Sequence, residues 1–220
     1  AAHGPHQPPL DWRGRNSGRF SMGWDRYREI VLVRQHEMGV VARETRLTRR
    51  PDEIQSWERL TDDEQMLFLR QIENFADFLE HTDHEVGRLV QALEEMDELA
   101  NTLFFYVLGD NGSSAEGSLL GTMNELAAMQ GIEPPIEASL SRIDEIGLPG
   151  TTPHFAVGWA WAGDAPFQWV KQIASHFGAT RNGLIVSWPD EIDDVGATRF
   201  QFHHVIDVAP TILDVVGISE

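Results

Sequence analysis

The chain has 220 residues, of which 41% are hydrophobic, so it can build a real core and disorder of the whole chain is excluded. Its 17 lysines and arginines face 35 aspartates and glutamates, and the formal net charge of −18 repels phosphate backbones, which makes nucleic acid a poor partner. Cysteine is absent, which excludes disulfides and thiolate metal sites and leaves the cellular compartment undecided. No apolar stretch approaches the roughly 18 residues that a membrane span needs.

The beginning of the chain is predicted to be a loop followed by a helix. Residues 1–20 contain several prolines and glycines, which are typical of loops, and they open as A-A-H-G-P-H-Q-P-P without a methionine. We therefore expect the chain to be part of a longer protein. The charged segment 22–40 is predicted to be helical.

A long helix is predicted to begin after Thr61. Thr61 and Glu64 have the spacing of a capping box, in which the hydroxyl and the carboxylate satisfy opposite backbone amides. Apolar residues then recur three and four positions apart over 68–93, and this stripe is expected to pack on a sheet. The polar segment 81–84 is either a kink or a polar turn within one helix.

The run of apolar residues at 103–108 predicts a β-strand that is covered on both faces. A helix followed by a buried strand is typical of an α/β sheet. In such sheets, ligands bind beyond the carboxyl ends of the strands, which is where Asp110 and Asn111 lie.

The second half of the chain is rich in glycine, proline and serine. Residues 113–163 are predicted to be a loop excursion, which at this length is typical of a functional lid. Residues 184–186 predict a second buried strand, and 199–205 a weaker third one. Asp207 is expected to cap a short helix that ends near Val216. In the sequence H-H-V-I-D that contains this aspartate, we interpret the histidines as structural.

The Asp110-Asn111-Gly112 sequence has two interpretations. It is well suited to a turn, since Asn and Gly tolerate positive φ. Alternatively, the carboxylate and amide oxygens are ligands that calcium or magnesium takes, although two ligands are too few and others would have to come from other strand ends.

Other candidate residues are weaker when each is considered alone. His3 and His6 flank Pro5 and are either exposed and inert or able to act as a general acid. Lys171 and His176, beside glycines, could bind an oxyanion, whereas the alternative is a solvated face. The tryptophans of G-W-A-W-A-G-D-A-P-F-Q-W favour core packing over a substrate platform.

Taken together in chain order, five segments resemble the sulfatase family, in its arylsulfatase branch within the alkaline-phosphatase-like superfamily. The opening A-A-H-G-P-H-Q-P-P is similar to an A-x-H-x-P-x-Q-x-P loop, and N-T-L-F-F-Y-V-L-G-D-N-G is similar to the family's N-T-(apolar)-x-D-N-G signature. The other three segments are L-E-H-T-D-H-E-V-G-R-L-V-Q-A-L, G-A-T-R-N-G-L-I-V-S-W-P and F-H-H-V-I-D-V-A-P-T-I-L-D-V-V-G-I.

The resemblance implies roles for five residues. Asp110 and Asn111 would be ligands of a divalent cation, typically Ca²⁺ or else Mg²⁺, and Asp110 would also help to orient or deprotonate the nucleophile. His3 would protonate the leaving alcohol or phenol. Lys171 would bind the sulfate and serve as a catalytic residue. His176 is the second candidate, because Lys171 lies one residue too far from the glycine pair, whose second glycine is alanine here.

The resemblance also implies an α/β, alkaline-phosphatase-like sandwich with a mainly parallel central sheet flanked by helices, here incomplete. Residues 1–220 would be the C-terminal part of a catalytic domain that pairs with the rest of that domain. The formylglycine nucleophile, made from a Cys/Ser-x-Pro-x-Arg motif, would lie upstream, because Ser187-Trp188-Pro189 lacks the arginine. The expected reaction is hydrolysis of a small-molecule sulfate ester.

Two other functions stay open at this stage. The first is a phosphodiesterase or phosphonate-ester hydrolase of the same superfamily, which would use much the same residues. The second is a non-catalytic, metal-stabilised binding protein that lacks the nucleophile.

Overall fold

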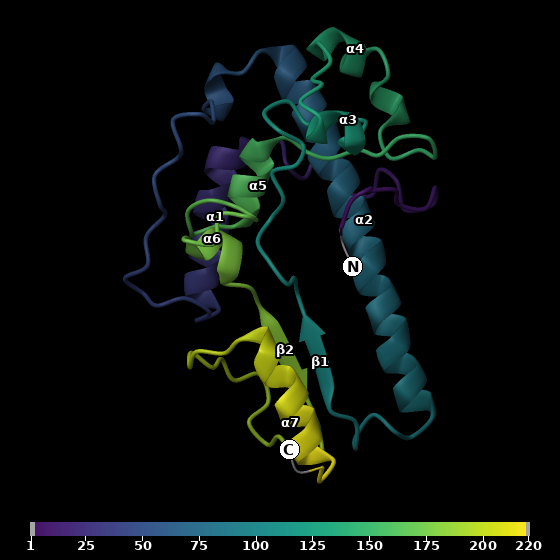
Figure 1. Cartoon of the computed structure of the whole chain (residues 1–220), viewed down its shortest axis with the longest axis vertical. Helices are drawn as coiled ribbons and strands as arrows, with labels where there is room; N and C mark the ends of the chain where they lie inside the picture. Colours follow the sequence, from purple (N-terminus) through teal and green to yellow (C-terminus); the bar gives the residue numbers. More distant parts are fainter. Residues whose placement is uncertain (1–2, 219–220) are drawn as a thin grey trace.

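The computed structural model describes residues 3–218, so the first two alanines of the opening motif and the last two residues lie outside the described part. Figure 1 shows the long helix α2 running along one side, with short helices at one end and two strands with helix α7 at the other. The helical elements are α1 (Gly23–Glu37), η1 (Trp57–Arg59), α2 (Asp62–Glu95), α3 (Glu125–Met129), α4 (Ile136–Leu140), η2 (Ile143–Glu145), α5 (Val157–Gly163), α6 (Phe177–Thr180), η3 (Val205–Asp207) and α7 (Val208–Val215). The strands are β1 (Phe104–Val107) and β2 (Leu184–Ser187). Within the described residues, no helix is long and apolar enough to cross a membrane.

Helix α2 begins with the predicted capping box. The Thr61 amide donates to the Glu64 carboxylate at 2.7 Å, and the Glu64 amide donates to the Thr61 hydroxyl at 3.2 Å. The helix continues unbroken through residues 81–84, which settles the choice between a kink and a polar turn. Its buried residues all lie between Leu67 and Asp77 and join an aromatic core, so packing of this helix on a sheet is not confirmed.

The core is built around tryptophans from segments that are far apart in the sequence. Trp24 of α1 and Trp57 of η1 meet edge to face at 4.9 Å, and Trp57 lies 5.6 Å from Trp159 of α5. Trp159 and Trp161 are 2% and 3% exposed, which confirms that they pack in the core. Long-range packing of this kind holds α1, α2 and α5 together.

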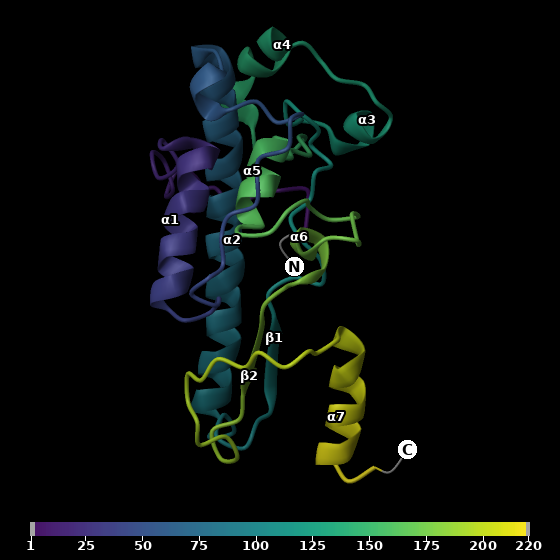
Figure 2. The ribbon, with the colours of Figure 1, turned by 90° about the vertical axis from the view of Figure 1, so that its left-hand side faces the viewer.

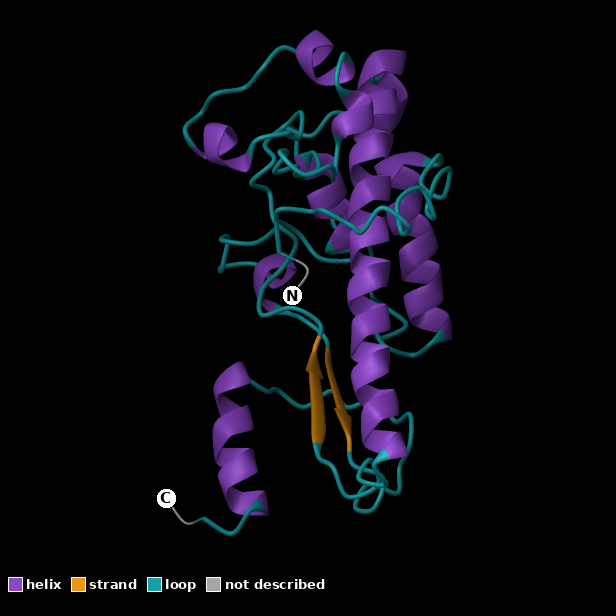
Figure 3. Cartoon of the chain, turned by 90° about the vertical axis from the view of Figure 1, so that its right-hand side faces the viewer, coloured by secondary structure: helices purple, strands orange, loops and turns teal. Residues whose placement is uncertain are grey.

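The two strands form an antiparallel pair with the register Phe104↔Ser187 to Val107↔Leu184. The predicted mainly parallel sheet is therefore not observed in residues 3–218, and the prediction of a third strand at 199–205 is wrong, since these residues form loop and the start of η3. Figure 3 shows the pair as a short ribbon beside the helices.

The prediction that both strands are buried is wrong. Leu108 is 57% exposed and Ile185 is 50% exposed, and the whole of β1 is only half-buried or exposed. An apolar run of this kind indicates a strand that neighbours cover on both faces, but two strands alone leave these side chains open to water. Elements that would cover them are not found among the described residues.

The C-terminal helix is present, but its cap differs from the prediction. The Asp207 carboxylate accepts from the His204 amide at 2.8 Å, and His204 Nδ1 accepts from the Ile206 amide at 3.2 Å, so the pair caps η3 rather than α7. This confirms the structural interpretation of His204. Figure 2 shows α7 standing to one side of the ribbon.

The excursion at 113–163 is mostly loop and turn with short helices, and it folds back on itself. A bridge joins Thr122 to His154 and a second one joins Asn124 to Thr152. Ile146 is fully buried in the core, so the segment is partly structural. Its function as a lid stays a prediction.

Candidate functional site

The Asp-Asn-Gly sequence begins three positions beyond the end of β1, where the chain runs against α6. The Gly112 amide donates to the Ala179 carbonyl at 2.9 Å. A Cβ on Gly112 would lie 1.7 Å from the Gly178 carbonyl oxygen, and a Cβ on Gly178 would lie 2.1 Å from the Trp169 carbonyl oxygen. Neither Asn111 nor Gly112 has a positive φ. The glycine is therefore required by close backbone packing and not by the left-handed conformation that the turn interpretation assumed.

Asp110 and Asn111 present oxygen atoms at this point. The Asn111 amide nitrogen donates to Asp110 Oδ1 at 2.8 Å, which turns the amide oxygen away from that carboxylate oxygen. Asp110 is exposed and Asn111 is half-buried. Carboxylate and amide oxygens suit a hard cation, which takes about six to eight oxygen ligands in the case of calcium. No group of three or more metal-binding acidic or histidine side chains occurs in residues 3–218, so these two side chains fit only as part of a larger ligand set.

His3 and Lys171 come together although 168 positions separate them in the sequence. Lys171 Nζ lies 3.4 Å from His3 Nε2 and 3.1 Å from Glu116 Oε1, and the Lys171 and Glu116 side chains are 17% and 13% exposed. The other Glu116 oxygen accepts from the Ser114 hydroxyl at 2.7 Å. Hydrogen bonds from Ser114 and Lys171 outweigh burial and lower the pKa of Glu116, so this half-buried carboxylate carries negative charge beside the ammonium group.

The backbone around Lys171 is strained. Trp169 and Gln172 have φ values of 66° and 77°, which side chains of this size rarely adopt. The Lys171 amide donates to the Ser113 carbonyl at 3.0 Å, which ties this segment to the chain just beyond Asn111. Strained backbone of this kind concentrates at functional sites, where the surrounding structure enforces it.

His176 lies apart from that pair. Its Nδ1 is 2.9 Å from the Ser175 hydroxyl, and its ring meets Trp169 edge to face at 6.2 Å. Within residues 3–218, no hydrogen bond or ion pair links the His176 side chain, or the side chains of Asp110 and Asn111, to His3 or Lys171. The structure thus brings together His3 and Lys171 directly, and it places the Asp110-Asn111 segment next to them through the backbone.

Two buried histidines lie beneath this region. His6 stacks on Phe155 at 5.5 Å, and its ring centroid lies 5.0 Å from that of His154. Burial lowers the pKa of His6 to about 3 and also lowers the pKa of His154. His6 is therefore a core residue, and His154, which the sequence analysis did not single out, is a second one.

Acid is expected to destabilise the protein through His6. Unfolded, this imidazole binds a proton below its ordinary pKa of about 6.5, whereas folded it does so only near 3. Stability is therefore fully present above that ordinary pKa and is lost as the pH falls towards 3. When the pH is lowered from about 7 to about 5, the unfolding free energy of the native protein should fall by about 2 kcal/mol more than that of His6→Phe. Urea denaturation at the two pH values measures this. Equal losses in the two proteins would mean that His6 is not buried in the neutral form.

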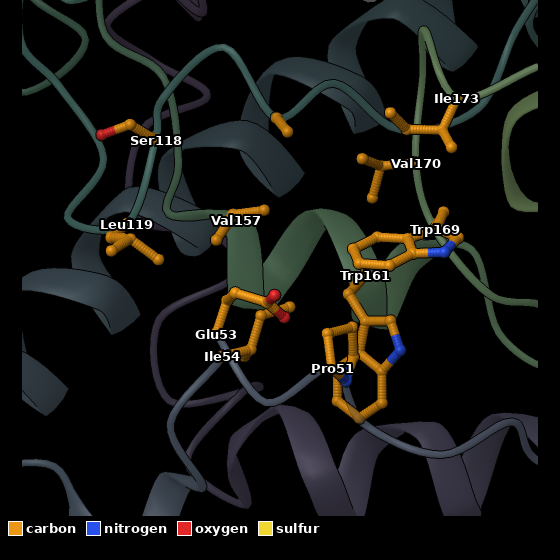
Figure 4. Close-up of a pocket in the computed structure, with 11 residues that line it drawn as sticks. Pro51, Glu53, Ile54, Ser118, Leu119, Val157, Trp161, Trp169, Val170 and Ile173 are labelled. Carbon is orange, nitrogen blue, oxygen red and sulfur yellow. The ribbon is translucent and has the colours of Figure 1, made fainter. Parts of the chain in front are cut away.

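An apolar pocket adjoins the segments that carry Lys171 and Glu116 (Figure 4). Its volume is about 280 Å³, and Trp161 and Trp169 form aromatic walls. Val170 flanks Lys171 in the sequence, and Ala115 flanks Glu116. The residues that line it are Pro51, Glu53, Ile54, Ala115, Ser118, Leu119, Val157, Trp161, Trp169, Val170 and Ile173. Pockets of this character bind the apolar part of small molecules.

Comparison with known proteins identifies the family. The sulfatase family model matches residues 1–218. An uncharacterized sulfatase from Schizosaccharomyces pombe is 29% identical over 225 residues, which cover 99% of this chain and 38% of that protein. An arylsulfatase from Klebsiella aerogenes is 23% identical over 219 residues, which cover 100% of this chain and 45% of that protein.

The chain therefore belongs to the sulfatase family, and membership implies an α/β fold of the alkaline-phosphatase-like kind. It spans less than half the length of these two relatives, at 38% and 45%.

Proposed function

We propose that the complete protein that contains this chain hydrolyses a small-molecule sulfate ester. The observation that carries the proposal is the approach of Lys171 Nζ to His3 Nε2 at 3.4 Å, in a chain that matches the sulfatase family over residues 1–218. A cation that can bind an anionic ester and a group that can donate a proton to its leaving oxygen thus lie side by side.

The hydrogen bonds around His3 suggest how these two side chains work. His3 Nδ1 lies 2.9 Å from the Gly4 carbonyl, which accepts when that nitrogen carries the proton. Nε2 is then the acceptor for Lys171. When a sulfate group enters, Lys171 would turn to the anion, and Nε2 could then take up a proton from solvent water. His3 passes that proton to the departing ester oxygen.

Asp110 and Asn111 would hold part of the divalent cation site, calcium or magnesium, whose charge offsets the negative charge that builds on the sulfate oxygens. Asp110 would also orient a formylglycine nucleophile, which would lie outside this chain. Glu116 keeps the Lys171 ammonium group directed into the site through its 3.1 Å contact. Strands from the rest of the domain would extend the sheet at its edges, and helices packed on it would cover the exposed faces of β1 and β2.

The proposal is tested by comparing the isolated chain with the complete protein. Residues 1–220 lack cysteine and the serine motif for formylglycine, so with an aryl sulfate ester and calcium they should give no turnover above background. The complete protein should hydrolyse the sulfate ester faster than the matching phosphate ester. Turnover by the isolated chain would contradict the location of the nucleophile. A complete protein that is inactive towards sulfate esters but binds calcium would be a non-catalytic member of the family.

The apolar pocket favours an aryl ester, because one of its aromatic walls, Trp169, lies two positions before Lys171 in the sequence. Replacing Trp169 by alanine should raise KM for an aryl sulfate about tenfold, since apolar surface is lost from the pocket, and kcat should change less. Trp169→Phe keeps an aromatic wall and serves as the control. Steady-state kinetics with an aryl sulfate and with methyl sulfate measure the effect. Equal losses for both esters would mean that the pocket does not receive the organic group.

A further inference from the structure

Asp164 is hydrogen-bonded to the chain segment that follows Asn111 in the candidate site. It follows the last residue of α5, and its Oδ1 accepts from the Ser113 amide at 2.9 Å, across 51 positions of sequence. The Lys171 amide in turn donates a hydrogen bond to the Ser113 carbonyl at 3.0 Å. One residue, two positions beyond Asn111, thus links the Asp164 carboxylate to the segment that carries Lys171.

The environment of Asp164 is costly for a carboxylate. Burial raises the pKa of Asp164 to about 7, although the Ser113 amide and the charge of Arg28 oppose this rise. Its Oδ2 is buried and has no hydrogen-bond partner among the described residues. The residue also lies at the C-terminal end of α5, where the free carbonyl groups disfavour a negative charge. Local stability alone would therefore not select aspartate here.

Arg28 fixes the loop that carries Asp164. This guanidinium is 1% exposed and donates to the carbonyls of Trp161, Pro166 at 3.2 Å and Phe167 at 3.1 Å. The carbonyls on both sides of Asp164 are thus anchored to α1. A Cβ on Gly163 would lie 3.0 Å from the Ser113 hydroxyl, so the segments that carry Gly163 and Ser113 are already in close contact. The carboxylate has little freedom to move away from Ser113.

We propose that Asp164 is a positioning residue that holds the Asp110–Ser113 segment and the Lys171 segment in one fixed relative geometry through the Ser113 amide. The inference rests on the proposed function, because it assigns Asp164 the task of keeping the cation ligands in register with the sulfate-binding lysine. In this role Asp164 would touch neither the cation nor the ester.

The test uses the complete protein with Asp164→Ala and Asp164→Asn. Removing the acceptor in the alanine variant should lower kcat about 10- to 100-fold and weaken calcium binding about tenfold, because groups that orient metal ligands and reacting groups have effects of this size. Asparagine keeps an acceptor at Oδ1, so it should stay within about threefold of the native protein. Calorimetry with calcium gives the affinity, and steady-state kinetics separate kcat from KM.

A matched control is Asp25→Ala. Asp25 likewise accepts a backbone amide, that of Trp57 at 2.9 Å, but it lies on α1 and has no bond to the site. Its loss should lower Tm while kcat and calcium affinity stay within about threefold of native. An equal loss of kcat in this variant would reduce the effect of Asp164 to general stability and overturn the inference.

Hydrogen exchange provides a readout that does not depend on activity. In Asp164→Ala, the peptide that contains Lys171 should exchange faster than in the native protein, because the Lys171 amide bonds to Ser113. An unchanged exchange rate, or an asparagine variant as impaired as alanine, would overturn the inference. If the native protein hydrolyses no sulfate ester, the proposed function fails, whereas exchange and calcium binding still decide the role of Asp164.

Discussion

If the proposed function holds, replacing Lys171 by alanine in the complete protein is expected to lower kcat/KM for a sulfate ester about 100- to 1,000-fold, the loss typical of a single group that stabilises developing negative charge. Lys171 Nζ lies 3.4 Å from His3 Nε2, so its ammonium group is beside the proposed proton donor. Its half-buried position strengthens the attraction to an anion, because solvent screens it less.

His176→Ala is the matched comparison, since the sequence left both residues as candidates for sulfate binding. Its ring is directed to Ser175 and Trp169 and not to His3, so its loss should change kcat/KM less than about tenfold. Steady-state kinetics with one ester decide between the two. The reverse result, with a large loss in His176→Ala and a small one in Lys171→Ala, would assign sulfate binding to the histidine.

Features of the fold and of the site that depend on neighbours in sequence could be predicted. The capping box of Thr61 and Glu64 depends on residues three positions apart, and it is present. The strand ending before Asp110 follows from one uninterrupted apolar run, and it is also present. Glu116 and Asp164 were missed, because they act across 55 and 51 positions and no local pattern records such pairs. The sequence signal that could have pointed to Glu116 is its position, as an acidic residue in the glycine- and serine-rich segment just beyond Asn111.

The burial of the strands illustrates a different limit. Uniform hydrophobicity at 103–108 correctly predicts a strand, but its covering elements cannot be identified from the strand itself. In residues 3–218, Val107 and Ile185 are 41% and 50% exposed, and β1 pairs only with β2. The apolar pattern indicates the burial that the strand is suited to, whereas the observed exposure depends on which neighbours are present.

The second large effect is expected at the proposed cation ligands, Asp110 and Asn111. Asp110→Asn and Asn111→Ala in the complete protein should each weaken calcium binding about 100-fold or more, since even groups that only orient metal ligands contribute about 10- to 100-fold. Asp110 is exposed, so removing its charge should barely change the unfolding free energy. Calorimetric titration with calcium measures the affinity, and added calcium should partly restore the activity of Asn111→Ala.

Asp190→Asn provides the control for Asp110, because it removes a comparable exposed carboxylate at the opposite end of the ribbon. The Asp190 amide donates to the Ala100 carbonyl, before β1, whereas Asp110 lies three positions beyond Val107, the last residue of that strand. Its calcium affinity should equal that of the native protein. If Asp110→Asn and Asn111→Ala also bind calcium with native affinity, the pair contributes no cation ligands. The close packing of Gly112 against Gly178 would then be the whole reason for the Asp-Asn-Gly sequence.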